Sequence, residues 1–473
     1  MLTNKSAFMV KKIFSMLFLS LILNAAETNT TNSLTLNEAI EILKSQNLEI
    51  KVAQLDVKAA KADEEAASGN HWGKLEFIQD VAHSNDAGNV FGFKLASREA
   101  TFGDFGAEEF MDAATPAMGA GQPIPDSAYT TPPDRLNYPE ARTFFQSKLK
   151  YEIPLFTGFQ ISSYSDIMNA MIKMKGLEKE QVINEKVYEL RKSFYDMALL
   201  KESTKNLMTI IENITTLEDM TKSMIDVGYA KKVDLLEVEA KKGNVERLIT
   251  QMHSNEKLLY HYISFLLNQK VTSIITPSQN VLLPVFTNED ILNTNLDIQR
   301  ASVGLEVRKG MLDVSKSSYY PMVGAFAEVA TADDTFLGDA QDHQSYTVGA
   351  RLTWNIFNGG IDSAKLQKAQ IEQLKTTTQI QLAQKGITLQ VDKIRTQIIT
   401  LDSDIISLEK ELALANEIYT NYEGRYREKL SSMSDVIIKQ SEQIQKILQL
   451  QQTKNMRNER IFALEKLANG EQK

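Results

Sequence analysis

The side chains that most often catalyse reactions or bind metals are few in this chain, and they lie far apart. The 473 residues include no cysteine, and the five histidines are His71, His83, His253, His261 and His343. No HExxH pattern or other close histidine pair is present, so a zinc enzyme would lack its ligands. The sequence also contains no P-loop, dinucleotide-binding fingerprint or Gly-x-Ser-x-Gly motif. We therefore predict that the protein is not an enzyme and uses no metal or cofactor.

Charged residues are numerous, but their distribution argues against a nucleic-acid partner. The chain has 52 basic and 61 acidic residues, a formal net charge of −9. Basic and acidic residues interleave along the predicted helices, which is typical of solvated helix faces rather than of a phosphate-binding stripe. We expect no binding to nucleic acid.

The N-terminal residues have the pattern of a secretory signal. Three lysines, the last at Lys12, precede an apolar run of 11 residues from Ile13 to Leu23, and small residues follow at Ala25 and Ala26. The run is shorter than the roughly 20 apolar residues that cross a bilayer. We predict a cleaved signal peptide over residues 1–26, with a retained anchor as the alternative. Because no later segment could be a transmembrane helix, membrane contact would have to be made by strands.

One short sequence motif occurs twice, each time where a predicted strand ends and a very long helical pattern begins. The first copy reads KYEIPLFTG over residues 150–158, and the second reads TWNIFNGG over residues 353–360. The phenylalanines Phe156 and Phe357 are 201 residues apart. NLEI at residues 47–50 is likewise echoed by NLDI at residues 295–298. Repetition over this length predicts an internal two-fold repeat.

The repeat predicts two halves after the signal. The first, residues 27–286, contains a helix, a β-hairpin over 74–154 and long helices over 158–268. The second, residues 287–473, contains a helix, a β-hairpin over 322–356 and long helices over 359–467. Residues 85–142 hold six of the chain's ten prolines and predict a long loop within the first hairpin.

Apolar residues in the long helical segments step alternately by four and three, the spacing of a coiled-coil seam. The first seam is Ile183, Val187, Leu190, Phe194 and Met197; the second runs from Ile387 to Ala415. These segments predict long, antiparallel coiled coils.

Four predicted strands of about 10 residues match the length of tilted membrane-spanning strands. An open four-stranded sheet cannot exist in lipid, so several copies would have to share a barrel, with eight strands from two copies or 12 from three. The alternate faces with Lys148, Lys150, Glu152, Arg351 and Asn355 would then face water. Seven aromatic residues at the strand ends would lie at the membrane interface: Trp72, Tyr151, Phe156, Tyr319, Tyr320, Trp354 and Phe357. The alternative is that these aromatic side chains pack a soluble core.

The chain resembles outer-membrane efflux proteins of the TolC family over essentially its whole mature length. The resemblance is carried by the repeat, the NLEI and NLDI starts, Tyr-Tyr-Pro at 319–321, and the Phe-Thr-Gly and Phe-Asn-Gly-Gly junctions. Val-Gly at 227–228 followed by VDLL at 233–236 is the most specific match. It implies an α+β membrane protein, a homotrimer whose 12-stranded transmembrane β-barrel continues into a periplasmic tunnel of antiparallel helices.

The resemblance also implies roles for the points where the long helices reverse, the first tip (residues 224–236) and the second tip (residues 424–437). Asp234, Tyr426 and Asp435 fall on positions of the periplasmic gate, while Val227, Gly228 and Tyr229 fall on the adaptor contact. The chain departs from the family pattern at Lys429, Ser431 and Ile438, so Lys231, Lys232, Arg425 or Arg427 would have to supply the gate's cations. The alternative is that the tips are solvated helix ends, with Asp234 and Asp435 capping their helices.

The implied function is that of an outer-membrane channel-tunnel in a tripartite efflux or type I secretion system. Its partners would be a periplasmic adaptor protein and an inner-membrane pump, and its helical part would lie in the periplasm. The sequence leaves open whether drugs, metal ions or proteins are exported. A soluble periplasmic coiled-coil scaffold or adaptor is the alternative function.

Overall fold

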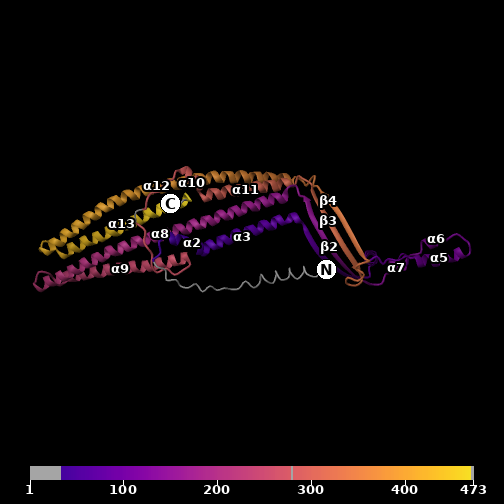
Figure 1. Cartoon of the computed structure of the whole chain (residues 1–473), viewed down its shortest axis with the longest axis horizontal. Coiled ribbons are helices and arrows are strands. Elements are labelled where there is room, and N and C mark those ends of the chain that lie inside the picture. The colour runs from indigo at the N-terminus through magenta and orange to yellow at the C-terminus, as the bar shows by residue number, and fades with distance from the viewer. Residues whose placement is uncertain (1–32, 279–280, 470–473) are drawn as a thin grey trace, which may run out of the picture. The chain divides into compact units, whose positions relative to one another are not determined.

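The structure is a computed structural model that describes residues 33–278 and 281–469 (Figure 1). The predicted signal peptide lies outside the described residues. The helices are α2 (Leu36–Gln46), α3 (Leu48–Gly69), α4 (Ala87–Ala96), α5 (Ala107–Gly119), α6 (Asp126–Tyr129), α7 (Asp134–Asn137), α8 (Gln160–Asp226), α9 (Lys232–Leu267), α10 (Asn288–Thr294), α11 (Leu296–Ser317), α12 (Ile361–Arg427) and α13 (Met433–Leu467), with short 3-10 turns η1 (Asn70–Trp72) and η2 (Phe102–Phe105). No helix in the described part of the chain is both long and apolar enough to cross a membrane.

The element lengths confirm the two-fold repeat. Helices α8 and α12 each have 67 residues, and α3 and α11 each have 22. Helices α9 and α13, which follow the tips, have 36 and 35 residues. The predicted boundary between the halves, at residues 286 and 287, stays a prediction.

The chain forms two compact units. Among the described residues, the helical unit consists of residues 33–52, 181–278, 281–291 and 388–469, and the sheet unit consists of residues 53–180 and 292–387. The boundaries do not follow the repeat, because α8 and α12 each contribute residues to both units.

The helical unit is held together by two apolar cores along the predicted seams. In the first core, Leu190, Phe194 and Met197 of α8 are fully buried against α2 and α9. In the second core, α8 and α9 meet α12 and α13 around Leu217, Val238 and Val436. Burial of Val391, Ile394, Ile398 and Leu408 confirms the second seam.

The sheet unit contains one antiparallel sheet in the order β1-β2-β3-β4. The strands are β1 (Lys74–Ser84), β2 (Arg142–Phe156), β3 (Met322–Asp333) and β4 (Gln344–Thr353). The register pairs Leu75 with Tyr151 and Leu149 with Val329, so apolar side chains share one face of the sheet and charged side chains share the other. The outermost strands, β1 and β4, have no partner on their outer edges among the described residues.

The fourth strand is shorter than predicted. Its last residue, Thr353, pairs with Met322, the first residue of β3. Pro321 precedes Met322 and has no N–H to donate, so the ladder ends there. Trp354 and Ile356 therefore lie beyond the strand.

The prediction of a long loop over residues 85–142 is wrong. This insertion contains α4 to α7, and α5 even includes Pro116 near its C-terminal end. Aromatic contacts hold the helices together: Phe91 meets Phe105 edge-on with ring centroids 5.2 Å apart, and Phe110 meets Tyr129 at 5.5 Å. Pro125 and Pro133 are the N-cap residues of α6 and α7, so prolines begin these short helices rather than prevent them.

Candidate functional site

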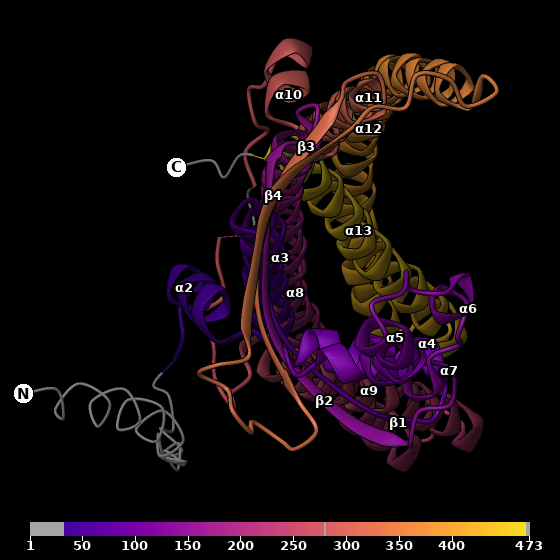
Figure 2. The ribbon, with the colours of Figure 1, turned by 90° about the vertical axis from the view of Figure 1, so that its right-hand side faces the viewer.

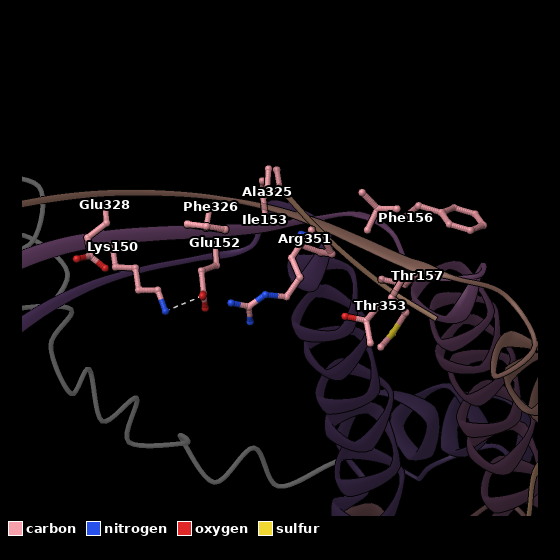
Figure 3. Close-up of a pocket in the computed structure, with 14 residues that line it drawn as sticks. Lys150, Glu152, Ile153, Phe156, Thr157, Ala325, Phe326, Glu328, Arg351 and Thr353 are labelled. Carbon is pink, nitrogen blue, oxygen red and sulfur yellow. Dashed lines mark ion pairs between the residues drawn. The ribbon is translucent and has the colours of Figure 1, made fainter. Parts of the chain in front are cut away.

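The charged face of the sheet lines a pocket of about 510 Å³ at the end of the strands near α8 (Figure 3). Lys150 pairs with Glu152 at 2.6 Å, and Arg351 lies beside Glu152. The side chains come from β2, β3 and β4, because residues that alternate along neighbouring strands point to the same face.

Charges of opposite sign alternate across this face. Lys150 stands between Glu76 of β1 and Glu328 of β3 in the register, and Lys148 pairs with Asp80 at 3.7 Å. The face carries five basic side chains, Lys74, Arg142, Lys148, Lys150 and Arg351, and four acidic ones, Glu76, Asp80, Glu152 and Glu328, so its charges nearly cancel. A face that is balanced in this way suits contact with water rather than with a fixed ligand of one charge.

The opposite face is apolar and exposed. Large side chains such as Phe77, Tyr346 and Val348 are each more than 60% exposed. Its polar residues are paired across strands: Ser147 donates to Gln79 at 2.6 Å, and His83 is 3.0 Å from the Thr143 hydroxyl. Gln79 is a polar residue on the apolar face of β1. Its amide oxygen is satisfied by the Ser147 hydroxyl on the neighbouring strand, as burial in an apolar medium requires.

The seven aromatic residues predicted at the strand ends all lie where sheet meets helix. The Tyr151 hydroxyl donates to the Trp72 carbonyl at 2.7 Å, and the Trp354 indole N–H donates to the Tyr319 carbonyl at 3.3 Å. The remaining three are Phe156 and Tyr320, which contact one another edge-on, and Phe357, which is 85% exposed. Their role at a membrane interface stays a prediction.

In both copies of the repeated motif, the chain passes from strand to helix at a glycine with positive φ. Gly158 has φ +62°, and a Cβ there would lie 2.7 Å from the Ser317 carbonyl oxygen. Gly359 has φ +69° but nothing within 4 Å of a Cβ. Both glycines adopt the left-handed backbone conformation, and only at Gly158 would neighbouring atoms also leave no room for a Cβ.

Each of the two aspartates predicted for the gate caps its own helix. Asp435 occupies the third position of α13, where its carboxylate accepts hydrogen bonds from the Ser432 hydroxyl at 2.7 Å and the Ser432 N–H at 3.2 Å. Asp234 does the same in α9, accepting from the Lys231 N–H at 2.7 Å. The N-cap residues are therefore Ser432 and Lys231 rather than the aspartates.

The environment of Asp435 keeps its carboxylate charged. Hydrogen bonds from Ser432 hold the pKa of Asp435 below its usual value, and Arg425 and Lys439 contribute in the same direction. Among the candidate cations, Arg427 pairs with Glu423 at 2.5 Å, and Arg425 lies over the Tyr422 ring. Arg425 is thus the candidate cation that acts on Asp435.

Tyr426, the third predicted gate residue, is buried rather than exposed at the tip. It belongs to the second apolar core together with Met433 and Val436. Burial raises the pKa of Tyr426, the Thr221 hydroxyl opposes this effect, and Asp234 adds to it. Tyr426 and Asp234 are therefore close enough to interact.

The predicted adaptor residues occupy the turn between α8 and α9. Gly228 has φ +80°, while Val227 and Tyr229 are about two-thirds exposed. The Lys429 ammonium lies 3.1 Å from the Tyr229 ring centroid and so joins the second tip to the first. Sequence reasoning missed this contact. Lys429 has φ +63° in place of the family's glycine, and that departure was its only signal.

We expect the contact between Tyr229 and Lys429 to contribute about 0.5–1 kcal/mol, as exposed cation–π pairs do. A double-mutant cycle of Tyr229→Leu and Lys429→Ala, read by hydrogen exchange at the tips, measures this coupling. Lys232→Ala serves as the control, because Lys232 has no such contact with Tyr229. Coupling no larger than that of the control pair would contradict the prediction.

The buried carboxyl of Asp196 on α8 should make the stability of the protein depend on pH. Burial raises the pKa of Asp196 to about 6. Because the unfolded carboxyl titrates near pH 4, the folded state holds more protons between about pH 4 and pH 6, and stability falls as the pH rises through that window. Asp196→Asn should remove this part of the slope in thermal unfolding midpoints. Asp219→Asn, an exposed change on the same helix, should leave it; an unchanged slope in Asp196→Asn would refute the prediction.

Across residues 33–278 and 281–469, no group of three or more His, Cys, Asp or Glu side chains is placed to hold a metal ion. The features that stand out are instead the two-faced sheet and the paired tips.

The C-terminal part of the chain is similar to a known family. Residues 288–470 match the family described as outer membrane efflux protein. No curated protein sequence matches the chain.

Solved structures share the fold over nearly the whole chain. The structure of CusC covers 96% of each chain with a TM-score of 0.75 at 13% identity. The outer-membrane channel OprN covers 94% of each chain with a TM-score of 0.73 at 15% identity. The CmeC outer membrane channel of Campylobacter jejuni covers 94% of this chain and 90% of its own, with a TM-score of 0.72 at 12% identity. The chain therefore shares its fold with these solved structures, and its residues 288–470 resemble the outer membrane efflux protein family.

Proposed function

We propose that the protein is an outer-membrane channel-tunnel that exports solutes as part of a tripartite system. The observation that carries this proposal is the sheet, with an exposed apolar face and a charge-balanced opposite face. Such a sheet fits a wall between lipid and water. The helical part belongs to the periplasm.

The functional unit is a homotrimer. In lipid, the open edges of β1 and β4 must be paired, and three copies close a 12-stranded barrel with a lumen wide enough for water. The alternative of a soluble scaffold is not favoured, because it would leave Phe77, Tyr346 and Val348 in water.

Extraction tests this proposal. The protein should leave washed outer membranes only with detergent, as a trimer that dissociates on heating. Release by osmotic shock, as expected of a soluble scaffold, would refute the channel.

Asp234, Tyr426 and Asp435 form the periplasmic gate, in which three copies of Asp435 make an anionic ring that favours cations. Asp435→Asn removes the charge and retains an acceptor for the cap, so cation selectivity and block by multivalent cations in single-channel recordings should fall. Ser432→Ala is the matched control, since it weakens the cap and leaves the charge. Unchanged selectivity in Asp435→Asn would exclude the ring.

Val227, Gly228 and Tyr229 contact a periplasmic adaptor protein, through which an inner-membrane pump is engaged. Their exposure at the turn between α8 and α9 supports this role. Photo-crosslinking from position 227 should capture an adaptor in cells, whereas crosslinking from the exposed position 414 on α12 should not.

A further inference from the structure

We propose that residues 85–141 form a cap that restricts the outer end of the pore by size and charge, an inference that rests on the proposed channel function. The cap consists of α4 to α7 and belongs to the same compact unit as the sheet. Figure 2 shows these helices on the concave side of the curved sheet. No corresponding helices stand between β3 and β4, where the connection is short.

The cap packs against the charged, inward face of the sheet. The Phe93 ring of α4 stacks on Phe144 of β2, with centroids 4.3 Å apart and an interplanar angle of 9°. Phe144 is an even number of residues from Lys148 and Lys150, so its side chain shares their face. On β3, Ala330 and Ala332 of the same face are also buried. In a closed barrel, α4 therefore lies inside the lumen rather than on the lipid side.

Ionic contacts fasten the cap in this position. Arg142, at the start of β2, forms an ion pair with Glu99 and donates to the Ser97 hydroxyl at 3.2 Å. Within the cap, Lys94 of α4 forms an ion pair with Asp104, which is 7% exposed. The Thr101 N–H also donates to the Asp104 carboxylate, at 2.8 Å. The cap is therefore anchored to the sheet at its base and braced internally.

The internal brace of the cap withstands acid. Hydrogen bonds from Lys94 and the Thr101 N–H lower the pKa of Asp104 to about 2. A carboxyl with a lowered pKa contributes stability above its unfolded pKa near 4 and loses that contribution as the pH falls toward 2. The ion pair between Lys94 and Asp104 thus persists over the whole neutral and mildly acidic range.

The cap carries a net negative charge in addition to occupying space at the mouth of the pore. Residues 85–141 contain nine acidic and three basic side chains, whereas the charged face of the sheet is balanced. An excess of negative charge at a pore mouth attracts cations and repels anions. The outer mouth, rather than the barrel wall, therefore sets the charge preference of this end of the channel.

Conductance of the purified full-length trimer in planar bilayers tests the cap. Phe93→Ala removes the stacking contact, and a second variant replaces residues 87–140 with a short Gly-Ser linker. Opening the mouth should raise single-channel conductance about twofold or more and weaken cation selectivity. Phe265→Ala, which changes an exposed phenylalanine outside the cap, should leave both unchanged.

Thiol labelling gives a second readout that needs no deletion, because the chain has no cysteine. Thr347 lies opposite Glu328 on the inward face, so Thr347→Cys reports access to the lumen. A bulky, membrane-impermeant maleimide added outside whole cells should react several-fold faster when Phe93→Ala is also present. Equal labelling rates together with unchanged conductance would overturn the cap. A parent protein that forms no channel would instead overturn the proposed function.

Discussion

Replacing Arg191 with methionine should lower the apparent free energy of unfolding by about 3–5 kcal/mol, the typical cost of removing one member of a buried ion pair. The Arg191 guanidinium lies 2.7 Å from the carboxylate of Glu465, which is 3% exposed, and 4.8 Å from the centre of the Phe462 ring. Methionine keeps most of the side-chain volume but withdraws the charge. The buried carboxylate then loses its arginine inside the helical unit.

The loss of helical circular dichroism in denaturant, for the protein in detergent, measures this effect. Arg135→Met is the matched control, because the Arg135–Glu108 pair has a similar distance of 3.1 Å but both side chains are more than 60% exposed. Exposed pairs contribute about 0–1 kcal/mol. Similar losses in the two variants would show that burial of the Arg191–Glu465 pair does not determine its contribution.

The second large loss of stability should come from Gly158→Ala in the first copy of the repeated motif. A side chain in the left-handed conformation costs about 1–2 kcal/mol. The added Cβ would also stand 2.7 Å from the Ser317 carbonyl oxygen and 2.9 Å from the Tyr320 Cβ, a conflict that typically costs about 1–3 kcal/mol more. The thermal midpoint should therefore fall substantially.

The repeat supplies the control for this prediction. Gly359→Ala imposes the same backbone cost at φ +69° with open space around the Cβ. Its midpoint should fall by less than half as much as that of Gly158→Ala. Equal shifts of the two thermal midpoints would mean that backbone conformation alone explains the glycines in both copies of the motif.

Much of the architecture could be predicted from the sequence because it depends on local periodicity. The seam from Ile183 to Met197 is buried as its spacing predicted, and the four strands occur where polar and apolar residues alternate. Gly228 lies with positive φ in the turn between α8 and α9, within the first tip where the long helices were predicted to reverse. Such features recur every two, three or four residues and need no knowledge of distant contacts.

The tertiary structure decided what depends on residues far apart in the chain. The insertion was predicted as a loop from its prolines, but rings distant in sequence, such as Phe91 and Phe105, bring its helices together. The fourth strand ends at Thr353 because its partner begins at Met322. Asp435 could be placed at a helix start from sequence alone, whereas the contact of Lys429 with Tyr229 joins tips 200 residues apart.

The sequence by itself therefore determined the repeat, the long helices, the approximate positions of the strands and the positions of the tips, since each depends on short-range periodicity. Only the tertiary structure decided that α4 covers the charged face of the sheet and that Tyr426 is buried beneath the tips. Both depend on which side chains meet after folding, and packing between distant segments is not encoded in any local pattern.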